Sequence, residues 1–115
     1  MDDQIGRAAQ MAGEWWAERL NDQHAHRRDA FAQEVAVRVE TALRANPDFP
    51  VFTECDYDPR GLLLEAVHAV GIECRGSFFS ARGILPEKHD LTIHPDRLEP
   101  KEGYGNWLDP IPVSE

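Results

Sequence analysis

The apolar residues in the first 46 positions recur every three or four residues, which is the spacing of helices that bury one face. One apolar stripe contains Ile5, Ala9, Ala12, Trp16 and Leu20, and a second contains Phe31, Val35, Val39 and Leu43. Asn46-Pro47 ends the second helix, because the residue before a proline is pushed out of the α region. The pattern predicts a helical hairpin over residues 3–46, with Asp22 or Asp29 as the N-cap of the second helix.

Trp15 lies beside the first stripe and is expected at its edge. Two roles are open for this side chain: it packs under the C-terminal part of the chain, or it forms part of an oligomer surface. The second role corresponds to a homodimer joined through the apolar helix face.

The spacing changes after Pro47. Phe49, Val51, Thr53 and Cys55 then alternate with polar or edge positions, which predicts a strand. Asp58-Pro59 predicts a helix start, with Asp58 as the N-cap and the proline at the first helical position. The buried face of this third helix contains Leu62, Leu63, Ala66, Val67 and Val70, and Gly71 is placed to cap its C-terminus.

Short elements are expected in the rest of the chain. Residues 72–80 resemble a tight hairpin that turns at Arg75-Gly76, and residues 91–93 form a further short strand. Prolines from position 86 to 112 predict a loop-rich tail over residues 95–115, because proline cannot donate to a strand ladder.

Together these elements predict one α+β domain over residues 1–115. It comprises the helical hairpin, a sheet and third helix over residues 49–94, and the irregular tail. The sheet is expected to be small and mostly antiparallel.

The chain is acidic: its 115 residues include 21 Asp and Glu against 12 Lys and Arg, for a net charge of −9, and the excess grows toward the C-terminus. Such a field repels phosphate backbones and anionic lipid, so we expect no direct binding of nucleic acid or membrane. The same field favours encounter with a basic surface on a partner protein. Alternatively, the charge serves only solubility.

The sequence shows no secretion signal and no apolar run long enough to span a membrane, which predicts a cytoplasmic protein. Cys55 and Cys74 are too few for a disulfide framework and are expected to be free thiols.

Candidate partner-binding residues fall in two segments. The first is a glycine-containing stretch in which aromatic residues, typical of binding hot spots, stand among carboxylates: Glu99, Glu102, Tyr104, Trp107 and Asp109. The second is the acidic patch around Glu54 and Asp56. In an alternative interpretation, Tyr104 and Trp107 fold back over the open side of the sheet and anchor the tail.

The leading hypothesis is a non-catalytic, acidic protein-binding module that needs no cofactor. In size and charge the chain is similar to phage- or prophage-borne inhibitors that occupy a nucleic-acid-binding surface of their target. The alternative is a small enzyme or metal-dependent protein that uses Asp56, Cys55, Cys74 and a histidine, His68 or His94. The chain has neither a glycine-rich phosphate loop nor a Gly-x-Ser-x-Gly elbow, which favours the first hypothesis.

Overall fold

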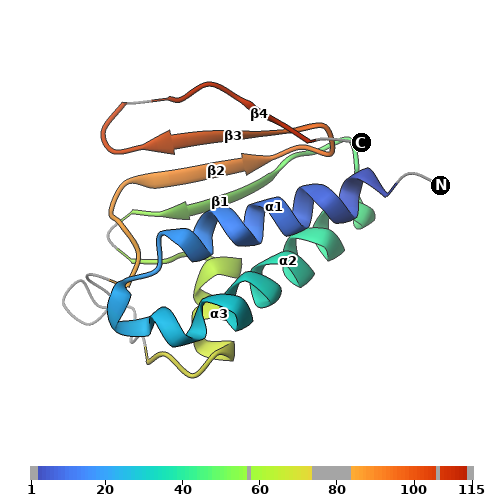
Figure 1. Cartoon of the computed structure of the whole chain (residues 1–115). Coiled ribbons are helices and arrows are strands. Elements are labelled where there is room, and N and C mark those ends of the chain that lie inside the picture. Colours follow the sequence, from blue (N-terminus) through green and yellow to red (C-terminus); the bar gives the residue numbers. More distant parts are fainter. Residues whose placement is uncertain (1–2, 57, 74–83, 106, 114–115) are drawn as a thin grey trace.

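The computed structural model describes residues 3–56, 58–73, 84–105 and 107–113. It is an α+β fold, as the sequence predicts (Figure 1). The helices are α1 (Gln4–Glu18), the 3-10 helix η1 (Asp22–Arg27), α2 (Arg28–Ala45) and α3 (Leu62–Ala69). The strands are β1 (Val51–Cys55), β2 (His89–Ile93), β3 (Arg97–Glu102) and β4 (Ile111–Pro112), which form one antiparallel sheet in the order β1-β2-β3-β4. In the described residues no helix is long and apolar enough to cross a membrane.

The helical hairpin forms as the apolar spacing predicts. The four stripe residues of α2 are fully buried, as are Ala9, Ala12 and Trp16 of α1. The two helices lie very close together at Gly13, where an added Cβ would lie 2.2 Å from the carbonyl oxygen of Ala32. Only glycine fits this crossing without moving the helices apart.

The predicted N-cap of α2 is wrong. Residues 22–27 form η1, and Arg27, the residue before α2, makes no side-chain cap hydrogen bond. Asp22 instead pairs with Arg28 at 2.8 Å. The Arg28 guanidinium also donates to the carbonyl oxygens of Ala17 and Leu20 near the end of α1. The connection between α1 and α2 is thus stabilised by the side chain of a basic residue and not by an acidic N-cap.

Trp15 is buried by the chain itself. Its ring meets that of Trp16 edge to face, with centroids 4.8 Å apart, and the Arg19 guanidinium lies 3.6 Å from its centroid. Arg19 also binds Glu102 of β3 at 2.6 Å. Trp15 therefore packs beneath the C-terminal part of the chain and contributes nothing to an exposed oligomer surface.

The start of α3 differs from the prediction. Asp58 does not cap the helix: α3 begins at Leu62, and its N-cap position is Gly61, with φ +55° and no side-chain hydrogen bond. Pro59 is buried and forms an antiparallel bridge with Cys55, and the Arg60 N–H donates to the carbonyl of Glu54. Residues 59 and 60 thus run back beside β1, and the chain enters α3 only after Gly61.

The other end of α3 confirms the sequence interpretation. Gly71 has φ +82° and donates to the carbonyl of His68, while Ile72 donates to that of Val67. These two bonds form a Schellman motif, with buried Ile72 as its apolar residue. Neither Ile72 nor Glu73 belongs to a strand; the rest of the hairpin expected over residues 72–80 lies outside the described residues.

The predicted irregular tail contains two strands, β3 and β4, so its description as loop-rich is wrong over residues 97–102. β3 is an inner strand although it contains Pro100. The Pro100 carbonyl accepts the N–H of Leu108, on the side away from β2. A residue's two backbone groups point to the same side of an antiparallel strand, so the N–H that proline lacks is not needed by the β2–β3 ladder.

Candidate functional site

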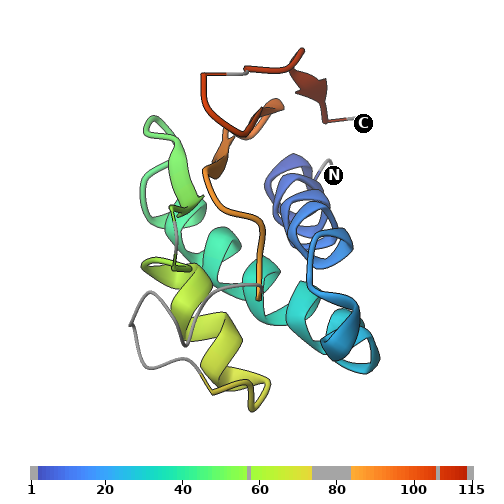
Figure 2. The same ribbon diagram turned by 90° about the vertical axis from the view of Figure 1, so that its left-hand side faces the viewer.

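The sheet has two unlike faces. Side chains of one face pack on the helices and are buried: Thr53, Cys55, Leu91, Ile93 and Leu98. Figure 2 shows α1 and α2 on the same side of the sheet. The register places the alternate residues on the opposite face, here called the outer face: Phe52, Glu54, Asp90, Thr92, Glu99 and Lys101. No helix among the described residues covers this outer face.

Three aromatic side chains are exposed at the outer face. Phe52 is 73% exposed, Tyr104 67% and Trp107 59%. Trp107 is brought onto this face by an antiparallel bridge with Lys101, and Phe52 pairs with Thr92 of β2. Tyr104 and Trp107 therefore leave most of their surface open to a partner and do not seal the sheet as an anchored tail would.

Two adjacent shallow hollows connect these rings. The first, of about 350 Å³, is lined by Phe52, Thr53, Glu54, Asp90, Thr92 and Trp107. The second, of about 360 Å³, is lined by Glu54, Asp56, Lys88, Asp90, Lys101, Gly103, Tyr104 and Gly105. Glu54 and Asp90 belong to both. The structure thus brings together four of the seven residues expected to bind a partner, namely Glu54, Asp56, Tyr104 and Trp107.

Two lysines, which the sequence interpretation did not consider, moderate the charge of this surface. Lys88 forms an ion pair with Asp56, and the Lys101 ammonium lies 3.9 Å from Asp90. Each also approaches an aromatic ring: Lys101 is 5.7 Å from the centroid of Trp107. Within the described ranges no cation pairs with the exposed carboxylate of Glu54.

The other predicted acidic residues lie apart from the two hollows. Glu99 is on the outer face and accepts from His94 at 2.7 Å and from Arg97 at 3.4 Å. The hydrogen bond from His94 is the main reason why the pKa of Glu99 lies below its usual value of 4.5. Glu102 faces the helices and binds Arg19, while Asp109 is exposed in the loop before β4.

Phe52 and Asp90 were missed as candidate residues, although a signal for Phe52 was present. If Val51, Thr53 and Cys55 point inward, strand alternation places Phe52 outward. Asp90 could not be found in this way, because its position opposite Glu54 depends on the pairing of β1 with β2.

The described cysteine and histidines of the enzyme hypothesis are not gathered at one place. Cys55 is fully buried, with its Sγ 3.9 Å from the carbonyl oxygen of Leu85, and behaves as a small core residue. His94 follows β2 at the end of the sheet opposite to Cys55, and Cys74 lies outside the described residues. His68 is exposed on α3. Among the described side chains, no group of three or more His, Cys, Asp and Glu could hold a metal ion.

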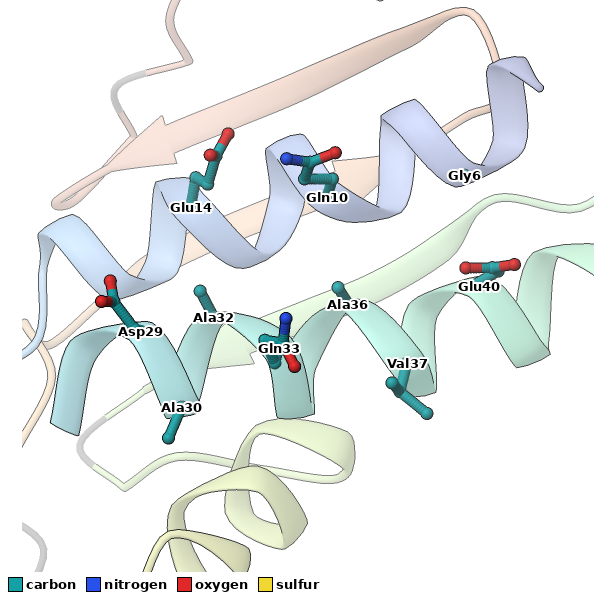
Figure 3. Close-up of a pocket in the computed structure, with 10 residues that line it drawn as sticks. All are labelled: Gly6, Gln10, Glu14, Asp29, Ala30, Ala32, Gln33, Ala36, Val37 and Glu40. Atoms are coloured by element: carbon teal, nitrogen blue, oxygen red, sulfur yellow. The ribbon is translucent and has the colours of Figure 1, made fainter. Parts of the chain in front are cut away.

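A larger groove, of about 840 Å³, runs between α1 and α2 (Figure 3). Ala32 and Ala36 point from α2 toward α1 and form its floor, while Glu14, Asp29 and Glu40 supply carboxylates from both helices. Glu40 is already paired with Arg44 at 2.9 Å. The groove is thus open to solvent, with small residues at its floor and carboxylates along its rim.

Comparisons with known proteins provide no further guide: no family model matches the chain, and no curated protein is significantly similar to it.

Proposed function

We propose that this protein is a non-catalytic binding module that docks on a basic surface of a partner protein through its outer face. The observation that carries the proposal is the group of exposed rings, Phe52, Tyr104 and Trp107, on a sheet face that the described helices leave open. Large aromatic side chains contribute much of the binding energy at protein interfaces when a partner buries them.

The charge of the chain supports a basic partner. The net charge is −9, and the carboxylate of Glu54, which pairs with no cation among the described residues, lines both hollows. Long-range attraction would speed encounter, whereas the aromatic contacts would determine how long the complex lasts. Asp56 is paired with Lys88, and Asp90 with Lys101. These two carboxylates therefore attract a basic partner less strongly than unpaired carboxylates would.

The experiment is capture of partners from cell lysate by immobilised protein, comparing wild type with Phe52→Ala and Trp107→Ala. The matched control is Val37→Ala, which removes an apolar side chain that is 61% exposed on α2, away from the sheet. We expect both aromatic variants to lose the same captured proteins and the Val37 variant to keep them. Retention by all three variants would refute the outer face as the docking site.

The dependence of capture on salt concentration tests whether electrostatic attraction contributes to docking. Exposed charge pairs are screened at about 0.5 M ionic strength, so capture should weaken there. A captured protein that is held equally at low and high salt would contradict docking on a basic surface.

The more specific form of the proposal is inhibition of a partner that binds nucleic acid. In that case carboxylates of the outer face occupy positions of phosphate groups on the partner. Adding the protein to a complex of a captured partner with its nucleic acid should then release the nucleic acid, and Trp107→Ala should release less. Formation of a ternary complex would contradict inhibition but not docking.

A further inference from the structure

The first hollow of the outer face contains both aromatic rings and carboxylates. It is lined by the exposed rings of Phe52 and Trp107 and by the acidic residues Glu54 and Asp90. None of the described residues that line it is basic. Its volume of about 350 Å³ is at the small end of ligand pockets, which suits a single side chain of a partner.

Glu54 and Asp90 are like charges in direct register. The pairing of β1 with β2 places them opposite each other, and both side chains are on the outer face. The Cβ atoms of such cross-strand partners lie about 4.5–5.5 Å apart, and like charges at this separation destabilise a sheet. A cation held between the two carboxylates would remove that repulsion. The pair therefore favours a cationic occupant independently of the net charge of the chain.

The basic side chains nearest to this pair are engaged elsewhere. Arg60 lies across β1 from Glu54 and donates its N–H to the Glu54 carbonyl, but its guanidinium lies 3.8 Å from the carboxylate of Asp56. Lys101 is 3.9 Å from Asp90 and lines the second hollow but not the first. In the part of the chain that the structure describes, Glu54 pairs with no cation. Its carboxylate is therefore the uncompensated charge of the first hollow.

We infer that the first hollow binds the guanidinium of an arginine from the partner. A guanidinium is flat, stacks on aromatic rings and presents forked N–H donors to a carboxylate, whereas the ammonium of lysine is a compact, strongly hydrated charge. It would contact the rings of Phe52 and Trp107 and donate to Glu54. The arginine enters from the outer face, so it needs no access to the edge of β1, which residues 59 and 60 occupy. The inference rests on the proposed docking function and specifies which group of the partner is recognised.

The test uses three short peptides with the full-length protein. Each is an acetylated and amidated tripeptide with glycine on both sides of arginine, lysine or citrulline, which has nearly the shape of arginine but no charge. Binding is followed by NMR through the indole N–H signal of Trp107, because the other two tryptophans, Trp15 and Trp16, are buried. A hollow for one side chain binds weakly, so each peptide is titrated to about 50 mM at constant ionic strength.

The three peptides separate shape from charge. We expect the arginine peptide to bind at least about threefold more tightly than the lysine peptide. It should bind at least about tenfold more tightly than the citrulline peptide, which cannot form charge-assisted hydrogen bonds. Equal affinity for arginine and lysine would overturn the recognition of a guanidinium, and equal affinity for arginine and citrulline would overturn the recognition of a cation.

Two variants with matched controls locate the bound arginine. Phe52→Ala should weaken binding of the arginine peptide by about twofold to fivefold, and Glu54→Gln by about threefold. The control for the ring is Phe49→Ala, since Phe49 is 66% exposed but lines neither hollow. The control for the charge is Glu14→Gln, at an exposed position of α1. Losses that are equal in variants and controls would overturn the inference; thermal unfolding checks that each variant is folded.

The outcomes distinguish this inference from the proposed function. If the arginine peptide leaves the signal of Trp107 unchanged, the inference is wrong, while capture from lysate still decides whether the outer face docks on a partner. If the peptide binds in the hollow but Phe52→Ala and Trp107→Ala capture the same proteins as wild type, docking through the outer face is refuted and the arginine-binding hollow is confirmed.

Discussion

The indole N–H of Trp16 donates a hydrogen bond of 2.8 Å to the hydroxyl of Thr53, which in turn donates at 2.7 Å to the carbonyl of Leu91. Both side chains are buried. The chain of two bonds joins α1 to β1 and β2 where the helices meet the sheet. It satisfies the polar groups of a core that is otherwise apolar.

Replacing Thr53 by valine keeps the shape of the side chain but leaves the Trp16 N–H without an acceptor. We expect a loss of about 1–3 kcal/mol in the free energy of unfolding, the usual cost of an unsatisfied buried donor. Urea denaturation measures it. Thr92→Val is the matched control, because Thr92 is buried in the adjacent strand but lies on the outer face. Equal losses in the two variants would contradict a special role for the Trp16 bond.

Gly13→Ala tests the close approach of α1 and α2. The new methyl group would meet the Ala32 carbonyl oxygen at 2.2 Å, and backbone atoms cannot move aside as a flexible side chain does. We expect destabilisation by about 1–3 kcal/mol from overpacking, although alanine is the better helix former. The control is Glu14→Ala, at the next, exposed position of α1. Unchanged or increased thermal stability of Gly13→Ala would show that the two helices can separate at little cost.

Glu99 should give stability a specific dependence on pH. The hydrogen bond from His94, then the charges of His94 and Arg97, lower the pKa of Glu99 in the folded state below 4.5. A lowered folded-state pKa adds stability above the unfolded value, and this stability disappears as the pH falls through the folded value. Glu99→Gln should therefore have a lower melting temperature than wild type at about pH 6, and the difference should shrink toward about pH 3.

Asp109→Asn serves as the control for that measurement. It also removes one carboxylate, but Asp109 is exposed and has no ion pair among the described residues. A difference between wild type and Glu99→Gln that stays constant from neutral to acidic pH would mean that the carboxylate of Glu99 contributes no pH-dependent stability.

Local sequence patterns predicted the parts of the fold that local interactions determine. The stripes of α1 and α2 and the Gly71 cap are confirmed, because side-chain spacing and backbone conformation specify them within a few residues. The strand predicted from Phe49 is confirmed over Val51–Cys55, but Phe49 itself lies before it in a bend. Asp58-Pro59 misled the interpretation, because a bridge to Cys55 competes with the helix start. Pro100 also misled the interpretation. A proline is tolerated in an inner strand such as β3 only where its nitrogen does not face the ladder with a neighbouring strand, and this depends on the strand pairing.

The candidate site was predicted in part for the same reason. The composition around Tyr104 and Trp107 indicated a binding segment, but whether their rings are open or buried depends on how the chain returns along β3. Strand register brings Tyr104 and Trp107 close to Glu54. It also places Lys88 and Lys101 beside the carboxylates with which they pair. Register between segments that are far apart in the sequence cannot be read from either segment alone.

The clamp of Arg19 between Trp15 and Glu102 has a consequence for the order in which the molecule is completed. Arg19 and Glu102 are separated by 83 positions, whereas α1 and α2 are neighbours in sequence. During synthesis the helical pair can therefore assemble early. The Trp15 and Trp16 indoles then remain exposed to solvent until the last strands are made. A chain shortened before β3 should retain helix content but expose this pair, and be prone to aggregate.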